Sequence, residues 1–343
     1  MDTLVRRLLF TLDPERAHEW ALRCLDGAAR LGWSNAPPMG TPDESVALMG
    51  LQFPNRVGAA AGMDKNADHV RGLSALGFGF IEVGTVTPRG QTGNSRPRLF
   101  RIPERRAVIN RLGFNNAGVD YLLERLAHAR TDAVIGVNIG KNRDTPMAAA
   151  VGDYVDAFER VHACADYVAV NLSSPNTPGL RALQAGEALH ELLGELKQRQ
   201  GHLAKEQGRY VPLVIKIAPD MSDDELVTLA RALVAAQVDG VTATNTTTDH
   251  SAVAGFRNGD ETGGLSGAPL MAPSTAVLAR LRAVVGPKLP IIGVGGVLTG
   301  DDAVAKYRAG ADLVQAYTGL IYRGGRLVRE MRQALADTSP RQG

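Results

Sequence analysis

Short hydrophobic segments alternate with amphipathic segments along most of the chain. Between residues 57 and 316, eight segments of three or four apolar, often β-branched residues recur. Such short segments, bounded by turn residues, are typical of buried strands, and the stretches between them have helical periodicity. The predicted strands are residues 57–60, 80–83, 134–137, 167–170, 213–215, 240–243, 291–294 and 313–316.

Eight strands that alternate with helices predict the α/β class and a (β/α)8 TIM barrel. Two of the intervening helices start with a capping box, Ser222–Glu225 and Thr299–Asp302. A doubly wound open sheet is the alternative fold. No G-x-G-x-x-G motif opens a helix after the first strand, which weakens that alternative.

The first forty residues follow a different pattern and predict a small two-helix extension. Asp13, Pro14 and Glu15 form a typical helix start, and Gly32 a typical end. We predict an N-terminal segment over residues 1–40, with a linker at 35–40, and a barrel over 41–343. The apolar face of the first helix is Leu4, Val5, Leu8, Leu9 and Leu12, and that of the second is Ala17, Trp20, Ala21, Cys24, Leu25 and Ala28.

The amino-acid composition argues against several classes of protein. The chain has 44% hydrophobic and 22% charged residues, as in soluble globular proteins, and its net charge of +2 argues against nucleic-acid binding. Cys24 and Cys164 have no zinc-ligand spacing and cannot form a disulfide framework, so we expect reduced thiols and no metal. No apolar run approaches the roughly 20 residues of a membrane helix, and no signal-peptide cleavage pattern is visible.

Every predicted strand ends in polar or glycine residues. The carboxyl ends of barrel strands converge on one face, where active sites lie, so these residues predict an active site there. They are Gly62, Asp64 and Lys65; Gly84 and Thr85; Asn138; Asn171; Lys216; Thr244, Asn245 and Thr246; Gly295 and Gly296; and Tyr317, Thr318 and Gly319.

Two of these strand ends suggest an anionic ligand. Gly295–Gly296 and Thr318–Gly319 follow strands seven and eight, where barrels often bind phosphate; ordinary turn glycines are the alternative. Lys216 ends an otherwise apolar strand, where its charge would stabilise a reduced flavin near N1. The alternative is a lysine that extends to solvent.

Two segments outside the strands have unusual compositions. Residues 171–179, NLSSPNTPG, combine two prolines with many hydrogen-bonding side chains, and a rigid turn before a helix is the alternative. Residues 89–111 hold seven arginines against Glu104. A nucleic-acid-binding patch is disfavoured, because only Phe100 could stack on a base. We therefore expect a solvated loop or a lid over an anionic site.

Together these motifs resemble the dihydroorotate dehydrogenase family, in its membrane-associated, quinone-dependent class (class 2). The resemblance covers nearly the whole chain, through DPERAH, AGMDKN, GFIEVGTVTPRGQTGNSRPRLFR, INRLGFNNAG, VNIGKN, NLSSPNTPGLR, VIKIAPD, NTT, GGLSG, GVGGV and QAYTGL. It implies a barrel that binds FMN and oxidises dihydroorotate to orotate in pyrimidine biosynthesis, passing electrons to a membrane quinone.

The resemblance also implies site residues. The implied FMN contacts are Ala61, Gly62, Lys65, Thr85, Asn138, Asn171, Lys216, Thr244, Gly267, Gly296, Tyr317 and Thr318. The implied substrate contacts are Lys65, Asn110, Arg111, Leu112, Gly113, Phe114, Asn171, Asn176, Asn245 and Thr246. Ser174 is the implied base, where the soluble classes use a cysteine. His18, Arg101 and Tyr317 resemble quinone-site positions.

Several expectations extend this interpretation. Serine is a weak base, so Thr177 is a possible relay for its proton. The N-terminal helices would hold the chain on a lipid bilayer, as a peripheral protein on the cytoplasmic face of the inner membrane. The alternatives are a soluble fumarate- or NAD-dependent dehydrogenase, a sugar-phosphate lyase or isomerase without flavin, and a non-catalytic membrane scaffold.

Overall fold

A closed barrel of eight parallel strands forms the centre of the protein, in a computed structural model that describes residues 8–32, 40, 44–177 and 179–338. The barrel order β10-β11-β12-β14-β15-β3-β4-β9 confirms the predicted TIM barrel and excludes an open sheet. The strands are β3 (Val57–Ala59), β4 (Phe80–Val86), β9 (Val134–Ile139), β10 (Tyr167–Asn171), β11 (Leu213–Ile217), β12 (Gly240–Ala243), β14 (Ile291–Val294) and β15 (Leu313–Ala316).

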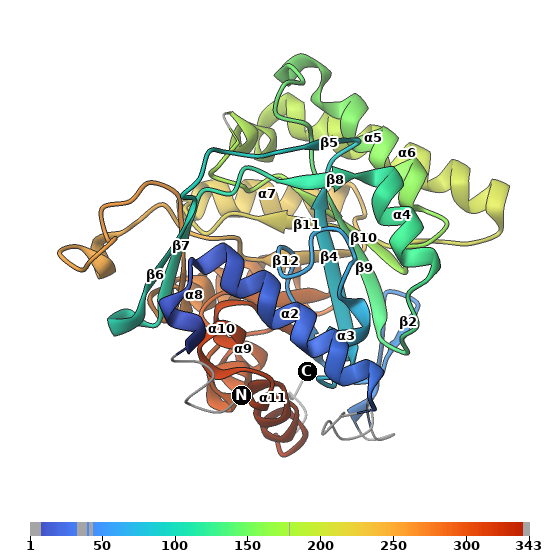
Figure 1. Cartoon of the computed structure of the whole chain (residues 1–343). Coiled ribbons are helices and arrows are strands. Elements are labelled where there is room, and N and C mark those ends of the chain that lie inside the picture. Colours follow the sequence, from blue (N-terminus) through green and yellow to red (C-terminus); the bar gives the residue numbers. More distant parts are fainter. Residues whose placement is uncertain (1–7, 33–39, 41–43, 178, 339–343) are drawn as a thin grey trace.

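Helices surround the barrel, as Figure 1 shows. Both predicted capping boxes are confirmed, at Ser222 before α7 and at Thr299 before α9. The helices are α2 (Pro14–Arg30), α3 (Val70–Ser74), α4 (Val119–Ala127), α5 (Ala150–Val161), α6 (Gly186–Gln207), α7 (Asp223–Ala235), α8 (Met271–Val285), α9 (Gly300–Arg308), α10 (Thr318–Arg323) and α11 (Arg326–Ala336).

Side chains fill the barrel interior. Tyr167 is fully buried there, and a Cβ on Gly136 would lie 2.1 Å from its ring, so only glycine fits beside this large residue. The antiparallel hairpin of β1 (Val46–Leu48) and β2 (Leu51–Phe53) packs against the same cluster. The amino-terminal end of the barrel is therefore closed, and space for a ligand remains at the carboxyl end.

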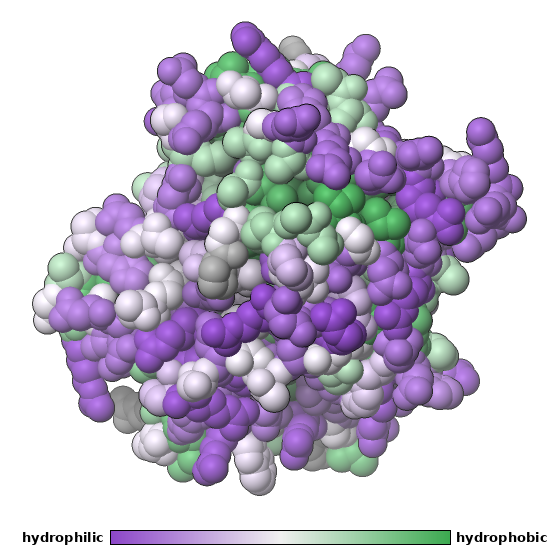
Figure 2. All heavy atoms as spheres, turned by 90° about the horizontal axis from the view of Figure 1, so that it is seen from above, coloured by the Kyte–Doolittle hydropathy of each residue, from purple (hydrophilic) through white to green (hydrophobic). Residues whose placement is uncertain are grey.

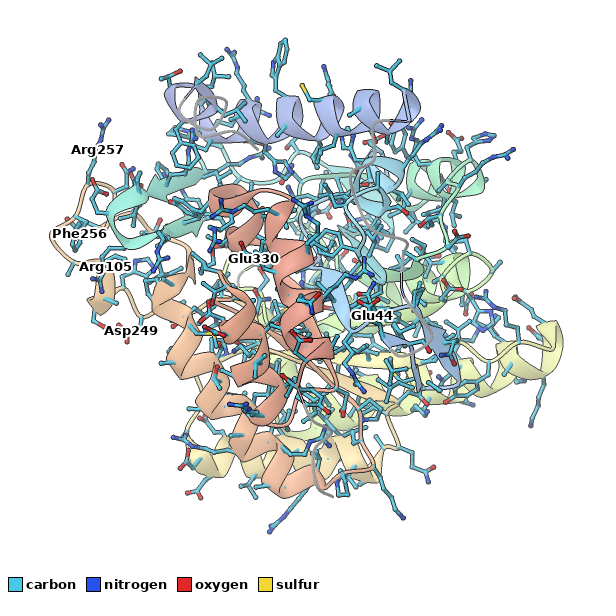
Figure 3. All side chains as sticks on the ribbon, turned by 90° about the horizontal axis from the view of Figure 1, so that it is seen from below. Glu44, Arg105, Asp249, Phe256, Arg257 and Glu330 are labelled. Atoms are coloured by element: carbon cyan, nitrogen blue, oxygen red, sulfur yellow. The ribbon has the colours of Figure 1, made fainter. Side chains whose placement is uncertain are left out.

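The arginine-rich segment is not the loop that we expected. It contains β5 (Arg89–Gln91), β6 (Leu99–Ile102) and β7 (Ala107–Asn110), which pair with β8 (Asn116–Gly118) and β13 (Gly264–Gly267). Leu99 and Ile102 are buried in different apolar clusters, so both faces of β6 are covered, which favours strands over a solvated loop. Figure 3 shows Arg105 near Phe256, and the guanidinium lies 5.6 Å from the ring centroid.

The second predicted N-terminal helix is confirmed as α2 (Pro14–Arg30), capped by the Asp13 side chain. It extends from the β6–β7 hairpin to α3 (Figure 1). Of the first predicted helix, residues 8–11 are helical, and Leu4 and Val5 lie outside the described residues. The linker is also outside them, except for Gly40.

Polar contacts hold α2 against the barrel. Glu15 accepts hydrogen bonds from Arg98 at 2.6 Å and pairs with Arg96 at 3.2 Å. At the other end of α2, Asp26 pairs with His69 at 2.5 Å. Several apolar side chains of the N-terminal segment stay exposed, and Figure 3 shows side chains along α2 that project away from the barrel.

Candidate active site

A cavity of about 970 Å³ opens at the carboxyl end of the barrel. Residues at or just after the ends of seven of the eight barrel strands line it, because parallel strands bring those ends together. Seen from above, most of the molecular surface is hydrophilic, with a hydrophobic band near its centre (Figure 2).

Most of the predicted site residues line this cavity, although they come from distant parts of the chain. The structure therefore brings together residues that the sequence could relate only by strand order and resemblance. They are Ala61, Gly62, Lys65, Thr85, Asn110, Leu112, Gly113, Phe114, Asn171, Ser174, Asn176, Lys216, Thr244, Asn245, Thr246, Gly267, Gly296, Tyr317 and Thr318.

Two predicted residues do not line the cavity. Asn138 is fully buried below it, where it accepts a hydrogen bond from Thr85 Oγ1 at 2.5 Å. Arg111 pairs with Glu261 at 2.7 Å, and its guanidinium lies 4.5 Å from the Phe100 ring centroid. These contacts explain why the Arg111 side chain points away from the cavity, which the motif NRLGF does not reveal.

Asparagines from separate segments are linked across the cavity. Asn171 Nδ2 donates to Thr85 Oγ1 at 3.0 Å, and Asn245 Nδ2 donates to Asn171 Oδ1 at 3.2 Å. In a separate pair, Asn176 Nδ2 donates to Asn110 Oδ1 at 3.2 Å. These amides offer paired donors and acceptors to a planar polar ligand.

Ser174 lies at the cavity wall and is only 5% exposed. Its Oγ accepts a hydrogen bond from the Asn176 backbone N–H at 3.2 Å, which orients the hydroxyl. Thr177 is also buried, but no hydrogen bond within the described residues joins it to Ser174. Pro178, the second proline of this loop, lies outside the described part of the chain.

Two lysines bring positive charge to the cavity. Lys65 is half-buried, and desolvation lowers its pKa to about 8. Lys216 is buried at the end of β11; burial lowers its pKa, and the charge of Glu82 opposes that shift. The prediction that Lys216 faces the barrel mouth is confirmed, and the solvent-exposed alternative is wrong.

Glu82 is a buried residue that the sequence analysis missed. Its carboxylate accepts hydrogen bonds from Asn138 at 2.8 Å, Gln315 at 2.9 Å and the Tyr167 hydroxyl at 3.0 Å. It is the only charged residue within the eight predicted strands, and this signal could have identified it. Side chains of three other barrel strands therefore hold this carboxylate in the barrel interior.

Several groups at the cavity fit a flavin. At Gly296 a Cβ would lie 2.3 Å from the Met271 backbone N, so the loop after β14 approaches α8 without a side chain. Gln315 lines the cavity, and its buried Oε1 has no hydrogen-bond partner in the part of the chain that the structure describes. Lys216 adds a cation at the same wall. These groups match a ring with N–H donors and a developing negative charge.

A second, larger cavity of about 1860 Å³ lies between α2 and the barrel, and its lining is mostly apolar. His18 and Arg101 line it, whereas Tyr317 lines only the first cavity. His18 Nε2 lies 2.7 Å from the Met63 carbonyl, and burial lowers the pKa of His18 to about 4. Arg101 donates to the Leu9 carbonyl at 3.1 Å.

The two cavities are adjacent in the chain as well as in space. Gly62 and Gly319 line the first cavity, and the next residues, Met63 and Leu320, line the second. One layer of backbone therefore separates the polar cavity from the apolar one. Among the described residues, none of the helices is both long and apolar enough to span a bilayer.

Comparison with known proteins agrees with this geometry. The family described as dihydroorotate dehydrogenase matches residues 44–338. A dihydroorotate dehydrogenase (quinone) of Cellvibrio japonicus is 52% identical, over 97% of both chains. One of Chromobacterium violaceum is 54% identical, also over 97% of both chains.

This chain belongs to the dihydroorotate dehydrogenase family. It is therefore a flavin-dependent oxidoreductase of pyrimidine biosynthesis, and its relatives place it in the quinone-dependent class. Solved structures agree: dihydroorotate dehydrogenase of Eimeria tenella in complex with ferulenol has a TM-score of 0.86 at 38% identity, over 94% of this chain and 90% of that one. The ligand-free enzyme has a TM-score of 0.85 at 39% identity, over 94% of both chains.

Family membership decides between the alternatives from the sequence. The lyase or isomerase and the non-catalytic scaffold are excluded, because the family consists of dehydrogenases. The soluble fumarate- or NAD-dependent classes are disfavoured, because the relatives are quinone-dependent enzymes that match over nearly their full length.

Proposed function

We propose that the cavity holds FMN against dihydroorotate and that Ser174 removes the substrate proton. The observation that carries this proposal is the position of Ser174: it is buried at the wall that Lys216 and the linked asparagines also line. When bound there, FMN would supply the hydride acceptor for C6 of dihydroorotate and the route for the electrons to a quinone.

The substrate carboxylate pairs with Lys65 in this proposal. Lys65 is half-buried, so its charge interacts more strongly than it would in open water. The amide edges of the substrate ring meet Asn110, Asn176 and Asn245, with Asn171 and Thr246 beside them. Arg111 stays outside this set, because Glu261 and Phe100 hold it.

Ser174 Oγ takes the proton from C5 of dihydroorotate. The Asn176 N–H that donates to this oxygen fixes its orientation, and burial removes competing water. Because a serine hydroxyl holds an extra proton only transiently, the proton has to leave to a neighbour. Thr177 stays our candidate relay, through a path that includes substrate or water.

In this proposal three glycines and the buried Lys216 contact the flavin. Gly62, Gly267 and Gly296 line the cavity and would let the backbone approach the flavin closely, and Thr318 and Tyr317 would hold it from the same cavity. Lys216 offsets the negative charge that develops on the ring, and Asn138 orients Thr85 and Asn171 from below.

The N-terminal segment, residues 1–40, provides quinone access and bilayer attachment in this proposal. The apolar cavity under α2 offers a lipid-soluble acceptor a dry path to the polar cavity, with His18 and Arg101 at its walls. Attachment through exposed apolar side chains would place the chain peripherally on the cytoplasmic face of the inner membrane.

Dihydroorotate oxidation by the purified protein tests this proposal. The bound flavin is released and identified by mass, and turnover is compared with a soluble quinone analogue, fumarate or NAD as the acceptor. We expect FMN and at least tenfold faster turnover with the quinone. Riboflavin or FAD as the bound flavin, or turnover with NAD alone, would contradict it.

A further inference from the structure

Lys306 is a buried cation that the reaction described above does not use. It lies on α9 with no solvent exposure. Its Nζ donates one hydrogen bond, to Ser274 Oγ at 2.5 Å. Within the described residues, no carboxylate lies within 4.0 Å of this ammonium group. A buried charge without a counter-charge is costly, so its retention requires an explanation.

The acid next to it in the helix does not neutralise it. Asp302 lies one turn before Lys306, but its carboxylate accepts the backbone N–H groups of Leu298 and Thr299, both at 2.9 Å. Asp302 therefore caps the start of α9. Burial lowers the pKa of Lys306 to about 7, and Asp302 only partly opposes this shift.

Ser274 connects the lysine to the wall of the active-site cavity. Its hydroxyl lies 3.1 Å from the Gly295 carbonyl and 2.6 Å from the Leu270 carbonyl. Gly295, Gly296 and Leu270 all line the cavity. Lys306 is thus two hydrogen bonds behind the loop that follows the seventh barrel strand, where barrels commonly bind phosphate.

We propose that Lys306 is the buried counter-charge of the flavin phosphate and that it acts as a positioning residue through Ser274 and the Gly295–Gly296 loop. This inference rests on the proposal that the flavin is FMN. A phosphate dianion on the cavity side of the loop would offset the charge of Lys306 across a thin, dry layer of backbone. The interaction of two charges is strong in such a medium.

The proposal predicts selectivity between two flavins. FMN and riboflavin share the same ring, and only FMN carries a phosphate. Lys306→Met removes the charge and keeps an apolar chain of similar length. We expect it to weaken FMN binding by roughly tenfold or more and to leave riboflavin binding unchanged. Lys216→Met, at the same cavity, should weaken both flavins alike if Lys216 faces the ring.

Equilibrium dialysis of the full chain against FMN or riboflavin measures both affinities, with the bound flavin quantified after denaturation. An unchanged preference for FMN in Lys306→Met would overturn the inference. If the wild-type chain itself binds riboflavin as tightly as FMN, the proposed cofactor is wrong instead.

Misfolding of the variant could also abolish flavin binding, so its stability is measured as a control. Because Lys306→Met removes an unpaired buried charge, we expect the variant to be at least as stable as wild type without flavin. If it binds neither flavin, Lys306→Gln repeats the comparison, because its amide is a neutral donor for Ser274. Loss of riboflavin binding in both variants would show that Lys306 only supports the loop, and would refute the inference.

Discussion

Glu82 Oε1 lies 4.0 Å from Lys216 Nζ, and both groups are buried just below the mouth of the barrel. Asn138, Tyr167 and Gln315 donate hydrogen bonds to the Glu82 carboxylate. Lys216 lines the cavity and Glu82 does not, so Lys216 would be the nearer charge to a flavin bound as proposed. The lysine at the cavity wall therefore has an acidic group behind it.

This arrangement predicts opposite effects of the two charges on the flavin potential. Lys216→Met should disfavour the anionic reduced flavin by about tenfold, which lowers a two-electron potential by ~30 mV. In that background, Glu82→Gln should raise the potential again, because it removes a negative charge. Spectroelectrochemical titration of both variants measures the shifts. Equal potentials in all three proteins would show that the pair does not act on the flavin.

Ser174→Ala should bind flavin normally and lose most flavin reduction by dihydroorotate. General-base catalysis typically contributes 10²–10⁴-fold, so we expect a loss of that order in anaerobic stopped-flow experiments. Ser173→Ala is a matched control, since Ser173 Oγ accepts from Asn245 and Ser173 does not line the cavity. If Ser174→Ala keeps more than a third of the wild-type rate, Ser174 is not the base.

Ser174→Cys should restore part of the activity with a different pH dependence. A free thiol has a pKa of about 8.5, so the rate should increase as pH rises towards that value and the thiolate forms. Flavin reduction between pH 6 and pH 10 measures the profile. A profile identical to that of wild type would argue against proton transfer to residue 174.

Glu15→Gln should loosen α2 from the barrel. Arg98 is 6% exposed and depends on Glu15 as its ion-pair partner, so the substitution leaves a buried guanidinium unpaired. We expect amide exchange in α2 to accelerate roughly a hundredfold, or about 3 kcal/mol of local stability. Asp223→Asn, which breaks the exposed pair with Arg280, should change local exchange less than about fivefold. Equal changes in amide exchange in both variants would contradict the claim that the Glu15–Arg98 pair holds α2 on the barrel.

Exposed apolar side chains of the N-terminal segment should attach the protein to liposomes. Leu8, Trp20 and Leu31 are 68%, 62% and 71% exposed, and we expect their joint replacement by Gln to abolish liposome flotation. Flavin reduction by dihydroorotate should not change.

Two controls belong to this experiment. Replacing Val234 and Phe256, which are also exposed, should leave flotation unchanged. Five arginines balance five acids in residues 1–33, so high salt should not release the wild-type protein. Release by salt would instead indicate an electrostatic attachment.

The sequence by itself determined the barrel and most of the cavity. Strand formation depends on local alternation and on turn residues, so the eight strands and the two capping boxes were predictable. Polar residues at strand ends, such as Asn171 and Lys216, identified the site because all parallel strands end on one face. The long motifs supplied the family and the chemistry.

Tertiary structure decided the rest, because side-chain direction and partners depend on contacts between distant residues. The arginine-rich segment forms strands only because β7 pairs with β13, some 150 residues away. Arg111 turns from the cavity because Glu261 holds it, and no local pattern encodes that pair. Glu82 and Lys306 acquire a role only when the barrel closes and removes water from their charges.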